Sequence, residues 1–153
     1  MIATAVLVAG KDLRIEARSR VLLWQVVPFG VLALVLCGLA IGPSRAQDAR
    51  LAPGLFYLVL VLAALLAINR SAGVERSPGT RASVATLGLD PAGVYLGKAL
   101  ALCVQLWALS VVLLAGTVLV MHTALVDTLG ALPSVAAACG ALAASGTLYG
   151  ALA

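Results

Sequence analysis

Four long stretches without a charged residue dominate this chain, at residues 21–42, 51–68, 99–121 and 128–153. The shortest has 18 residues, and because an α-helix rises about 1.5 Å per residue, each stretch can reach about 27 Å or more. The hydrocarbon core of a bilayer is about 30 Å thick, and a crossing helix needs roughly 17–25 apolar residues. The pattern therefore predicts an all-α, polytopic membrane protein with four transmembrane helices.

The composition also excludes an ordinary soluble domain. Of the 153 residues, 63% are hydrophobic and 10% are charged, whereas soluble domains have roughly 45–50% apolar and about 25% charged residues. The formal charge is +4, but the basic residues lie at the ends of apolar stretches and form no patch interleaved with aromatic residues. This placement is typical of the loops of membrane proteins, so we expect no nucleic-acid partner.

Residues 1–20 place apolar and basic side chains on different sides of a helix. The apolar side holds Ile2, Val6, Ala9, Leu13 and Ala17, and the basic side holds Lys11, Arg14 and Arg18. The pattern predicts an interfacial helix whose basic side meets the headgroups of membrane lipids. The alternative is a solvated leader helix.

The longest polar segment, 70–98, connects the second and third stretches. Pro78-Gly79 signals a turn, and residues 80–87 fit two turns of helix. Asp90-Pro91 is typical of an N-cap followed by a proline at the first helical position. Two shorter polar loops are expected at 43–50 and 122–127.

Lys and Arg are distributed unevenly among these segments. Four lie in the N-terminal segment, two in 43–50, four in 70–98 and none in 122–127. The positive-inside rule therefore places the N-terminus and segment 70–98 in the cytoplasm.

The last stretch, 128–153, is built from small residues at helical spacing. Ala136, Gly140 and Ala144 repeat every four residues, and Gly146 and Gly150 form a GxxxG pair. Small residues let helix backbones approach closely inside a membrane. We expect this helix to pack within a bundle or at a subunit interface.

The chain offers few groups for catalysis. Segment 93–98 superficially resembles a nucleotide-binding loop, but three residues separate its glycines instead of four, and Ala99 stands where Ser or Thr is needed. The single histidine, His122, is either a heme or metal contact on the outer face or a polar residue that ends a helix. We predict no metal site and no enzyme activity, so any ATP must bind to another chain.

The polar residues of the apolar stretches are Gln25, Gln105, Ser110 and Thr117, and none of them is ionisable. Ion-coupled carriers usually need intramembrane ionisable groups. The pattern therefore favours a permease that is powered by a partner. The alternative role of the glutamines is to form interhelical hydrogen bonds.

A family resemblance covers nearly the whole chain. Residues 51–70, which begin Leu-Ala-Pro-Gly and end Asn-Arg, resemble the second helix of the heme exporter protein B family, the permease subunit of the cytochrome c maturation ABC transporter. The following segment is similar to the family's acidic residue, Gly-Thr pair, short helix, proline and Gly-Lys pair. These features are matched here by Glu75, Gly79-Thr80, Leu87, Asp90-Pro91 and Gly97-Lys98.

The resemblance implies a role and a location. The chain would be a single transmembrane permease domain, 1–153, in the bacterial cytoplasmic (inner) membrane, with four of the family's six spans, and hence a fragment or a shortened copy. Segment 70–98 would hold the coupling helix that docks on a separate ATP-binding subunit. The residues implicated in this coupling are Glu75, Gly79, Thr80, Arg81 and Leu87.

The implied partners are this ATPase, other cytochrome c maturation membrane proteins, a second copy in a homodimer, and membrane lipids. Heme would be the substrate, and no cofactor is assigned to this chain. Two other functions remain open. One is an ABC-2 exporter permease for a lipid, polysaccharide or drug, because that wider class shares part of the loop pattern. The other is a scaffold that assembles membrane proteins through 128–153.

Overall fold

The computed structural model describes residues 2–20, 22–41, 45–75, 91–121 and 130–152. The elements are α1 (Ile2–Ser19), the π-helical turn η1 (Leu22–Val26), α2 (Val27–Ile41), α3 (Arg45–Glu75), α5 (Pro91–Met121) and α7 (Leu132–Leu152). None of the described residues belongs to a strand. The predicted all-α fold is confirmed.

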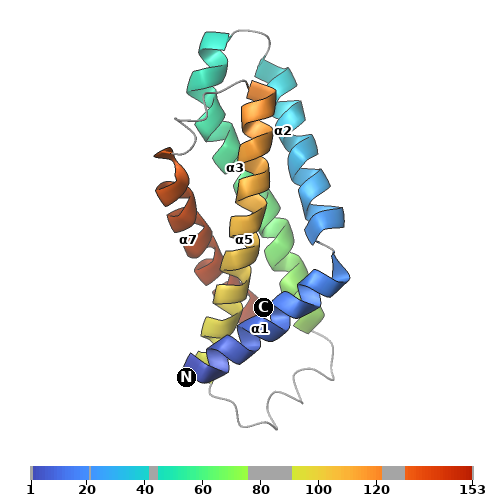
Figure 1. Ribbon diagram of the computed structural model, residues 1–153, viewed down its shortest axis with the longest axis vertical. Coiled ribbons are helices and arrows are strands. Elements are labelled where there is room, and N and C mark those ends of the chain that lie inside the picture. Colours follow the sequence, from blue (N-terminus) through green and yellow to red (C-terminus); the bar gives the residue numbers. More distant parts are fainter. Residues whose placement is uncertain (1, 21, 42–44, 76–90, 122–129, 153) are drawn as a thin grey trace.

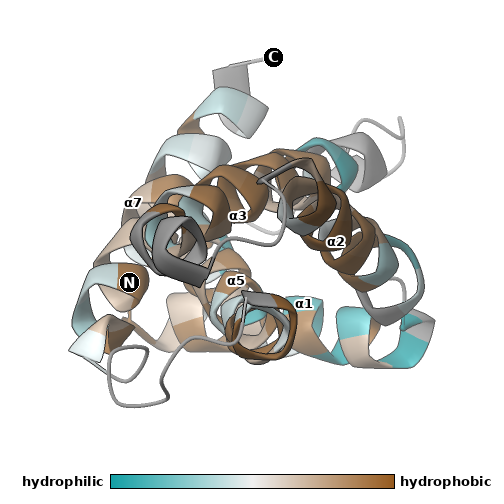
Figure 2. Ribbon diagram, turned by 90° about the horizontal axis from the view of Figure 1, so that it is seen from above, coloured by the Kyte–Doolittle hydropathy of each residue, from teal (hydrophilic) through white to brown (hydrophobic). Residues whose placement is uncertain are grey.

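Three of the helices contain segments long and apolar enough to cross a membrane, namely Leu51–Ser71, Pro91–Val120 and Leu132–Gly150. They stand beside α2 in an elongated bundle, and α1 runs across one end of it (Figure 1). The bundle helices are predominantly hydrophobic, whereas α1 carries most of its hydrophilic residues toward its C-terminal end (Figure 2). Large apolar side chains such as Leu32, Leu58 and Leu100 are exposed on the outside. Such a surface suits lipid rather than water.

Pro28 interrupts the stretch 21–42, which the sequence predicted as one helix. A proline has no N–H to donate to the carbonyl four residues earlier, here that of Trp24, and its ring crowds that carbonyl. The π turn η1 lies directly before α2, and its wider winding relieves this conflict. The apolar helical segment here, Trp24–Ala40, is shorter than the three candidate membrane spans. The structure thus corrects the prediction of one unbroken helix.

The predicted loop 43–50 is helical from Arg45 onward. α3 runs from there to Glu75, beyond the predicted end of the second stretch at residue 68. α3 starts with Arg, Ala and Gln, which are all good helix formers. The polar residues of this segment therefore extend the helix and do not form the predicted loop. Between residue 70 and Glu75 no proline stops the helix. By contrast, α5 begins at Pro91, the first helical position suggested by Asp90-Pro91.

Leucines of α5 fill the core of the bundle. Leu106, Leu109 and Leu113 are fully buried and form one cluster with Leu60 of α3. α2 approaches this cluster at Gly30, where an added Cβ would lie 3.0 Å from Leu113 Cδ2. Because lipid tails are as apolar as leucine, close packing rather than exclusion of water holds such helices together.

Hydroxyl groups inside the bundle are satisfied by helix carbonyls. Ser110 Oγ donates to Trp107 O at 2.7 Å, and Thr117 Oγ1 donates to Leu113 O at 2.8 Å. These bonds remove the cost of an unpaired hydroxyl in an apolar medium.

A hydroxyl chain also links α3 to the start of α7. Ser134 Oγ donates to Ala131 O at 2.7 Å, so the 2.7 Å bond between Tyr57 and Ser134 is donated by Tyr57. This hydrogen bond fixes the two helices at the end of the bundle that lies away from α1.

Candidate functional site

Three helix termini gather at one end of the bundle. α1 runs across this end, where α3 and α7 finish and α5 begins, and we call it the basal end (Figure 1). The predicted coupling segment, 70–98, includes the last turns of α3 and the first turns of α5. The basal end is therefore where any partner of that segment would bind.

A cleft of about 160 Å³ opens at the basal end between α3, α5 and α7. We call it the basal cleft. It is lined by Ile68 and Ser71 of α3, by Pro91, Val94, Tyr95, Lys98 and Leu102 of α5, and by Gly146, Thr147 and Gly150 of α7. Pockets that enclose drug-sized ligands measure about 300–1,000 Å³. The basal cleft in this conformation is therefore too small to enclose a porphyrin.

The walls of the cleft are joined by hydroxyls and by one close glycine contact. Tyr95 Oη donates to Ala144 O at 3.0 Å, which ties α5 to α7. Thr147 Oγ1 donates to Ala143 O of its own helix, also at 3.0 Å. At Gly146 an added Cβ would lie 2.7 Å from Ile68 Cγ1, so α3 and α7 touch at this point. The three helices that line the cleft are thus tied to one another.

α1 packs on α5 through a second close glycine contact. At Gly97 an added Cβ would lie 2.7 Å from Ala5 O and 2.8 Å from Val8 Cβ. One of these atoms belongs to the backbone of α1 and the other is a Cβ, so neither can move by a change of rotamer. The two helix backbones can approach this closely because Gly97 has no side chain. α1 therefore lies directly against the turns of α5 that also border the cleft.

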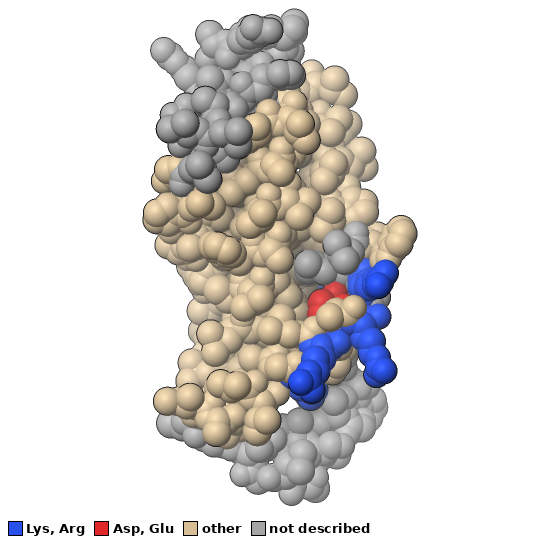
Figure 3. All heavy atoms as spheres, in the orientation of Figure 1, with Lys and Arg blue, Asp and Glu red and all other residues tan. Residues whose placement is uncertain are grey.

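Basic side chains lie on one side of the basal end. Arg14, Arg18 and Arg20 are exposed on α1 and just after it, and basic side chains gather near the C-terminal end of α1 in Figure 3. Arg70 of α3 donates from Nη1 to Gln25 Oε1 of η1 at 2.8 Å. This bond joins the end of α3 to the turn between α1 and α2, and it gives Gln25 the interhelical role considered for it above.

Most of the predicted coupling residues lie outside the described residues. Glu75 is the last residue of α3. Gly79, Thr80, Arg81 and Leu87 are not among the described residues, and neither is His122. The structure therefore places the two ends of the coupling segment and leaves their roles as predictions.

The predicted small residues of α7 lie on more than one side of the helix. The fully buried stripe runs through Val135, Cys139 and Ala143. Gly146 is also buried, whereas Ala136, Gly140 and Gly150 are half-buried and Ala144 is exposed. An added Cβ at Gly140 would meet no atom within 4 Å. The side with Ala136, Gly140 and Ala144 thus retains room for another helix.

Tyr95 was not among the residues that the sequence predicted for the site. Pro91, Tyr95, Lys98 and Leu102 follow one another at spacings of three or four residues, so they share one side of α5. This spacing was the signal in the sequence that could have identified Tyr95 as a neighbour of Pro91, Lys98 and Leu102. Gly97 was noted for its place in a motif and not as a packing position.

No three His, Cys, Asp or Glu side chains gather at metal-binding distance within the part of the chain that the structure describes. Cys37, Cys103 and Cys139 are free thiols on the bundle helices.

Comparison with known proteins gives one family. Neither the curated proteins nor the solved structures yielded a match. A family described as CcmB protein matches residues 1–153, which is the whole chain. The match agrees with the helical, lipid-suited bundle and with the resemblance seen in residues 51–98. The chain therefore belongs to the CcmB (heme exporter protein B) family, the membrane permease subunits of the ABC transporter for cytochrome c maturation.

Proposed function

We propose that this chain is the permease subunit through which a separate ATP-binding subunit drives heme handling for c-type cytochrome biogenesis. The ATPase docks on segment 70–98, and Glu75, Gly79, Thr80, Arg81 and Leu87 supply the contact. The Lys and Arg distribution supports a cytoplasmic position for this segment and for the N-terminus in the bacterial inner membrane.

The observation that carries the proposal is the convergence of helix ends. α3 and α5, which flank the coupling segment, reach the bundle end that α1 crosses and that holds the basal cleft. A force applied between these two helices would act at once on α7, through the contacts Tyr95–Ala144 and Ile68–Gly146. It would also act on α1 through Gly97. Packed helices transmit such displacement because they resist compression.

The proposal includes a second copy of the chain. Two sets of helices give a symmetric membrane unit, which is the commonest form of oligomer. The side of α7 with Ala136, Gly140 and Ala144 is available for this contact, because Gly140 has no neighbour at Cβ distance. Other cytochrome c maturation proteins and heme would then meet the assembled unit, with His122 as a candidate contact on the outer face.

Co-purification with the ATPase tests the coupling segment. Membranes that contain the tagged ATP-binding subunit are prepared with the wild-type chain, with Glu75→Ala and with Gly79→Val. We expect each variant to remain in the membrane and to lose binding at least roughly tenfold, which corresponds to about 1.4 kcal/mol. Gly54→Ala is the matched control, since Gly54 lies toward the other end of α3 and its added Cβ meets no atom within 4 Å. Unchanged co-purification in both coupling variants would overturn the assignment.

The substrate is tested separately from the partner. Cells that lack their own copy of the permease receive the wild-type chain, and heme covalently bound to c-type cytochromes is stained in gels. We expect the wild-type chain to restore the stain and Glu75→Ala to lose it. A chain that binds the ATPase but never restores cytochrome heme would instead be an exporter of another substrate.

A further inference from the structure

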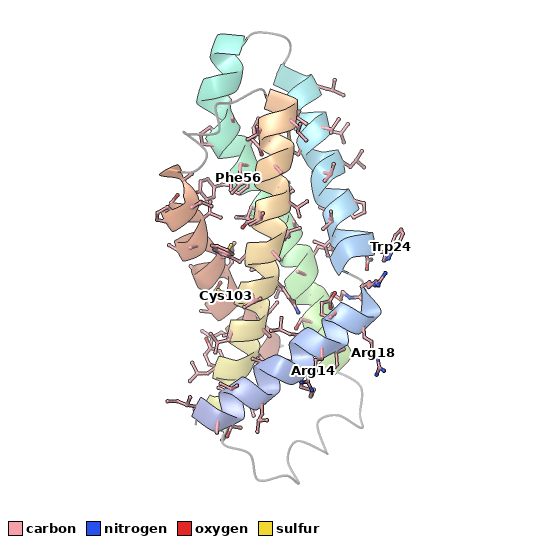
Figure 4. The ribbon with its side chains drawn as sticks, in the orientation of Figure 1. Arg14, Arg18, Trp24, Phe56 and Cys103 are labelled. Atoms are coloured by element: carbon pink, nitrogen blue, oxygen red, sulfur yellow. The ribbon has the colours of Figure 1, made fainter. Side chains whose placement is uncertain are left out.

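Three arginines form an exposed cluster where α1 meets the bundle. Arg14, Arg18 and Arg20 are all exposed, and Arg14 and Arg18 point away from the helices in Figure 4. We call these three residues the basic patch. Lys11 of the same helix pairs with Asp12 at 3.7 Å, and acidic atoms lie beside the basic ones in Figure 3. Residues 1–20 hold four basic side chains, Lys11, Arg14, Arg18 and Arg20, and two acidic ones, Asp12 and Glu16. The basic residues outnumber the acidic ones, so this part of the surface carries net positive charge.

An exposed tryptophan lies immediately beyond the patch. Trp24 has 77% of its surface exposed, and its ring projects away from the bundle near the end of α1 (Figure 4). Farther along α2, the exposed side chains are aliphatic or aromatic and apolar, as at Phe29, Leu32 and Leu36. Along this side of the molecule the surface therefore changes from cationic to indole to purely apolar.

This order matches the depth profile of one leaflet of a bilayer. Headgroup phosphates are outermost, the interfacial layer favours tryptophan, and acyl chains lie below. A docked soluble protein would account for the arginines but not for the apolar surface that continues from Trp24 along α2. Guanidinium groups also suit phosphate oxygens, because their planar N–H donors match them in pairs.

We propose that the basic patch and Trp24 form a binding site for anionic phospholipid. The headgroup phosphate binds to Arg14, Arg18 and Arg20, and the glycerol region packs on the Trp24 indole. The site does not depend on the ATPase or on heme, so it stands or falls apart from the proposed function.

The two tryptophans of the chain allow a direct test. Trp107→Phe leaves Trp24 as the single reporter, and Trp24→Phe leaves Trp107, which is 45% exposed midway along α5. Each full-length variant is reconstituted into phosphatidylcholine vesicles. Fluorescence quenching is then compared between added brominated phosphatidylglycerol and the same amount of brominated phosphatidylcholine.

We expect Trp24 to be quenched preferentially by the anionic lipid, with an affinity ratio of roughly 5, the contribution of one interfacial cation. The ratio should fall to about 1 in 1 M salt, where the Debye length is about 3 Å. Trp107 should show a ratio of about 1 throughout, because it lies away from the patch. Equal quenching of Trp24 by both lipids would overturn the proposal.

Charge variants in the Trp107→Phe background separate the patch from its surroundings. The triple change Arg14→Gln, Arg18→Gln, Arg20→Gln should abolish the preference, and the corresponding Lys variant should keep most of it. A preference that persists in the Gln variant would overturn the assignment. The assignment would also be overturned if the Trp107→Phe parent showed no lipid preference and its Gln variant lost binding to the ATPase. The patch would then bind a protein. If the Gln variant does not insert into the vesicles, the proposal is tested by the salt dependence of Trp24 quenching in the Trp107→Phe parent.

Discussion

The contact at Gly97 gives a quantitative test of how α1 is held on α5. In Gly97→Ala the new Cβ would lie 2.7 Å from Ala5 O and 2.8 Å from Val8 Cβ, whereas ordinary contact begins near 3.4 Å. α1 must therefore move away by about 0.6–0.7 Å. Neither neighbouring atom can be displaced by a change of rotamer, because one belongs to the backbone and the other is a Cβ.

The expected cost follows from a comparison with Gly140→Ala. Both glycines lie inside long helices, so alanine gains about 1 kcal/mol of helix propensity at each. At Gly140 the new Cβ meets no atom within 4 Å, whereas forcing extra atoms into a packed contact typically costs about 1–3 kcal/mol. Because the propensity gain cancels, Gly97→Ala should be less stable than Gly140→Ala by about 1–3 kcal/mol.

Unfolding in mixed micelles measures this difference. Each variant is titrated with sodium dodecyl sulfate in a mild detergent, and intrinsic tryptophan fluorescence follows the loss of structure. Trp24 is a suitable reporter because it lies just beyond the end of α1 (Figure 4). Equal free energies of unfolding for the two variants, within about 0.5 kcal/mol, would show that α1 does not rest on Gly97.

Two further predictions use the same unfolding assay. Tyr57→Phe removes the hydroxyl that donates to Ser134, so we expect a loss of about 0.6 kcal/mol, the average for interhelical hydrogen bonds in a membrane. In the double variant, Ser134→Ala should add little to the loss caused by Tyr57→Phe. If the losses of the two single variants add fully, the hydrogen bond between the two side chains is contradicted. Arg20 has a φ of 50°, in the left-handed region, so Arg20→Gly should be more stable than Arg20→Ala by about 1 kcal/mol. A more stable alanine variant would contradict this account of the turn.

The sequence predicted the bundle because lipid imposes strong requirements on a chain. A helix that crosses a bilayer must be long, apolar and internally hydrogen-bonded, so α3, α5 and α7 each lie largely within a predicted apolar stretch. The helix boundaries differ from the predicted ones, because helix formers such as Arg45 extend a helix beyond the membrane without any apolar signal. Pro28 did carry a signal, and the proline rule accounts for the π turn before it.

The contacts at the basal end depend on information that a single helix does not contain. A helical wheel of residues 1–20 identifies the apolar and basic sides, but Ile2 and Val6 of the apolar side are exposed. The side that packs on α5 includes Ala5 and Val8 instead. Small residues there were unremarkable until the position of Gly97 was known. Tyr95 and Lys98 likewise share a cleft only because α7 lies beside them.

The contact between α1 and α5 also sets an order for biogenesis. α1 precedes α2 and α3 in the chain, and Gly97 follows only after all three have been made. Until α5 inserts, Ala5 and Val8 have no partner surface. Nascent α1 therefore remains at the membrane surface while α2 and α3, which follow it in the chain, enter the bilayer. Closure of the basal end is thus a late event of insertion, although it uses residues of α1, which precedes the bundle helices in the chain.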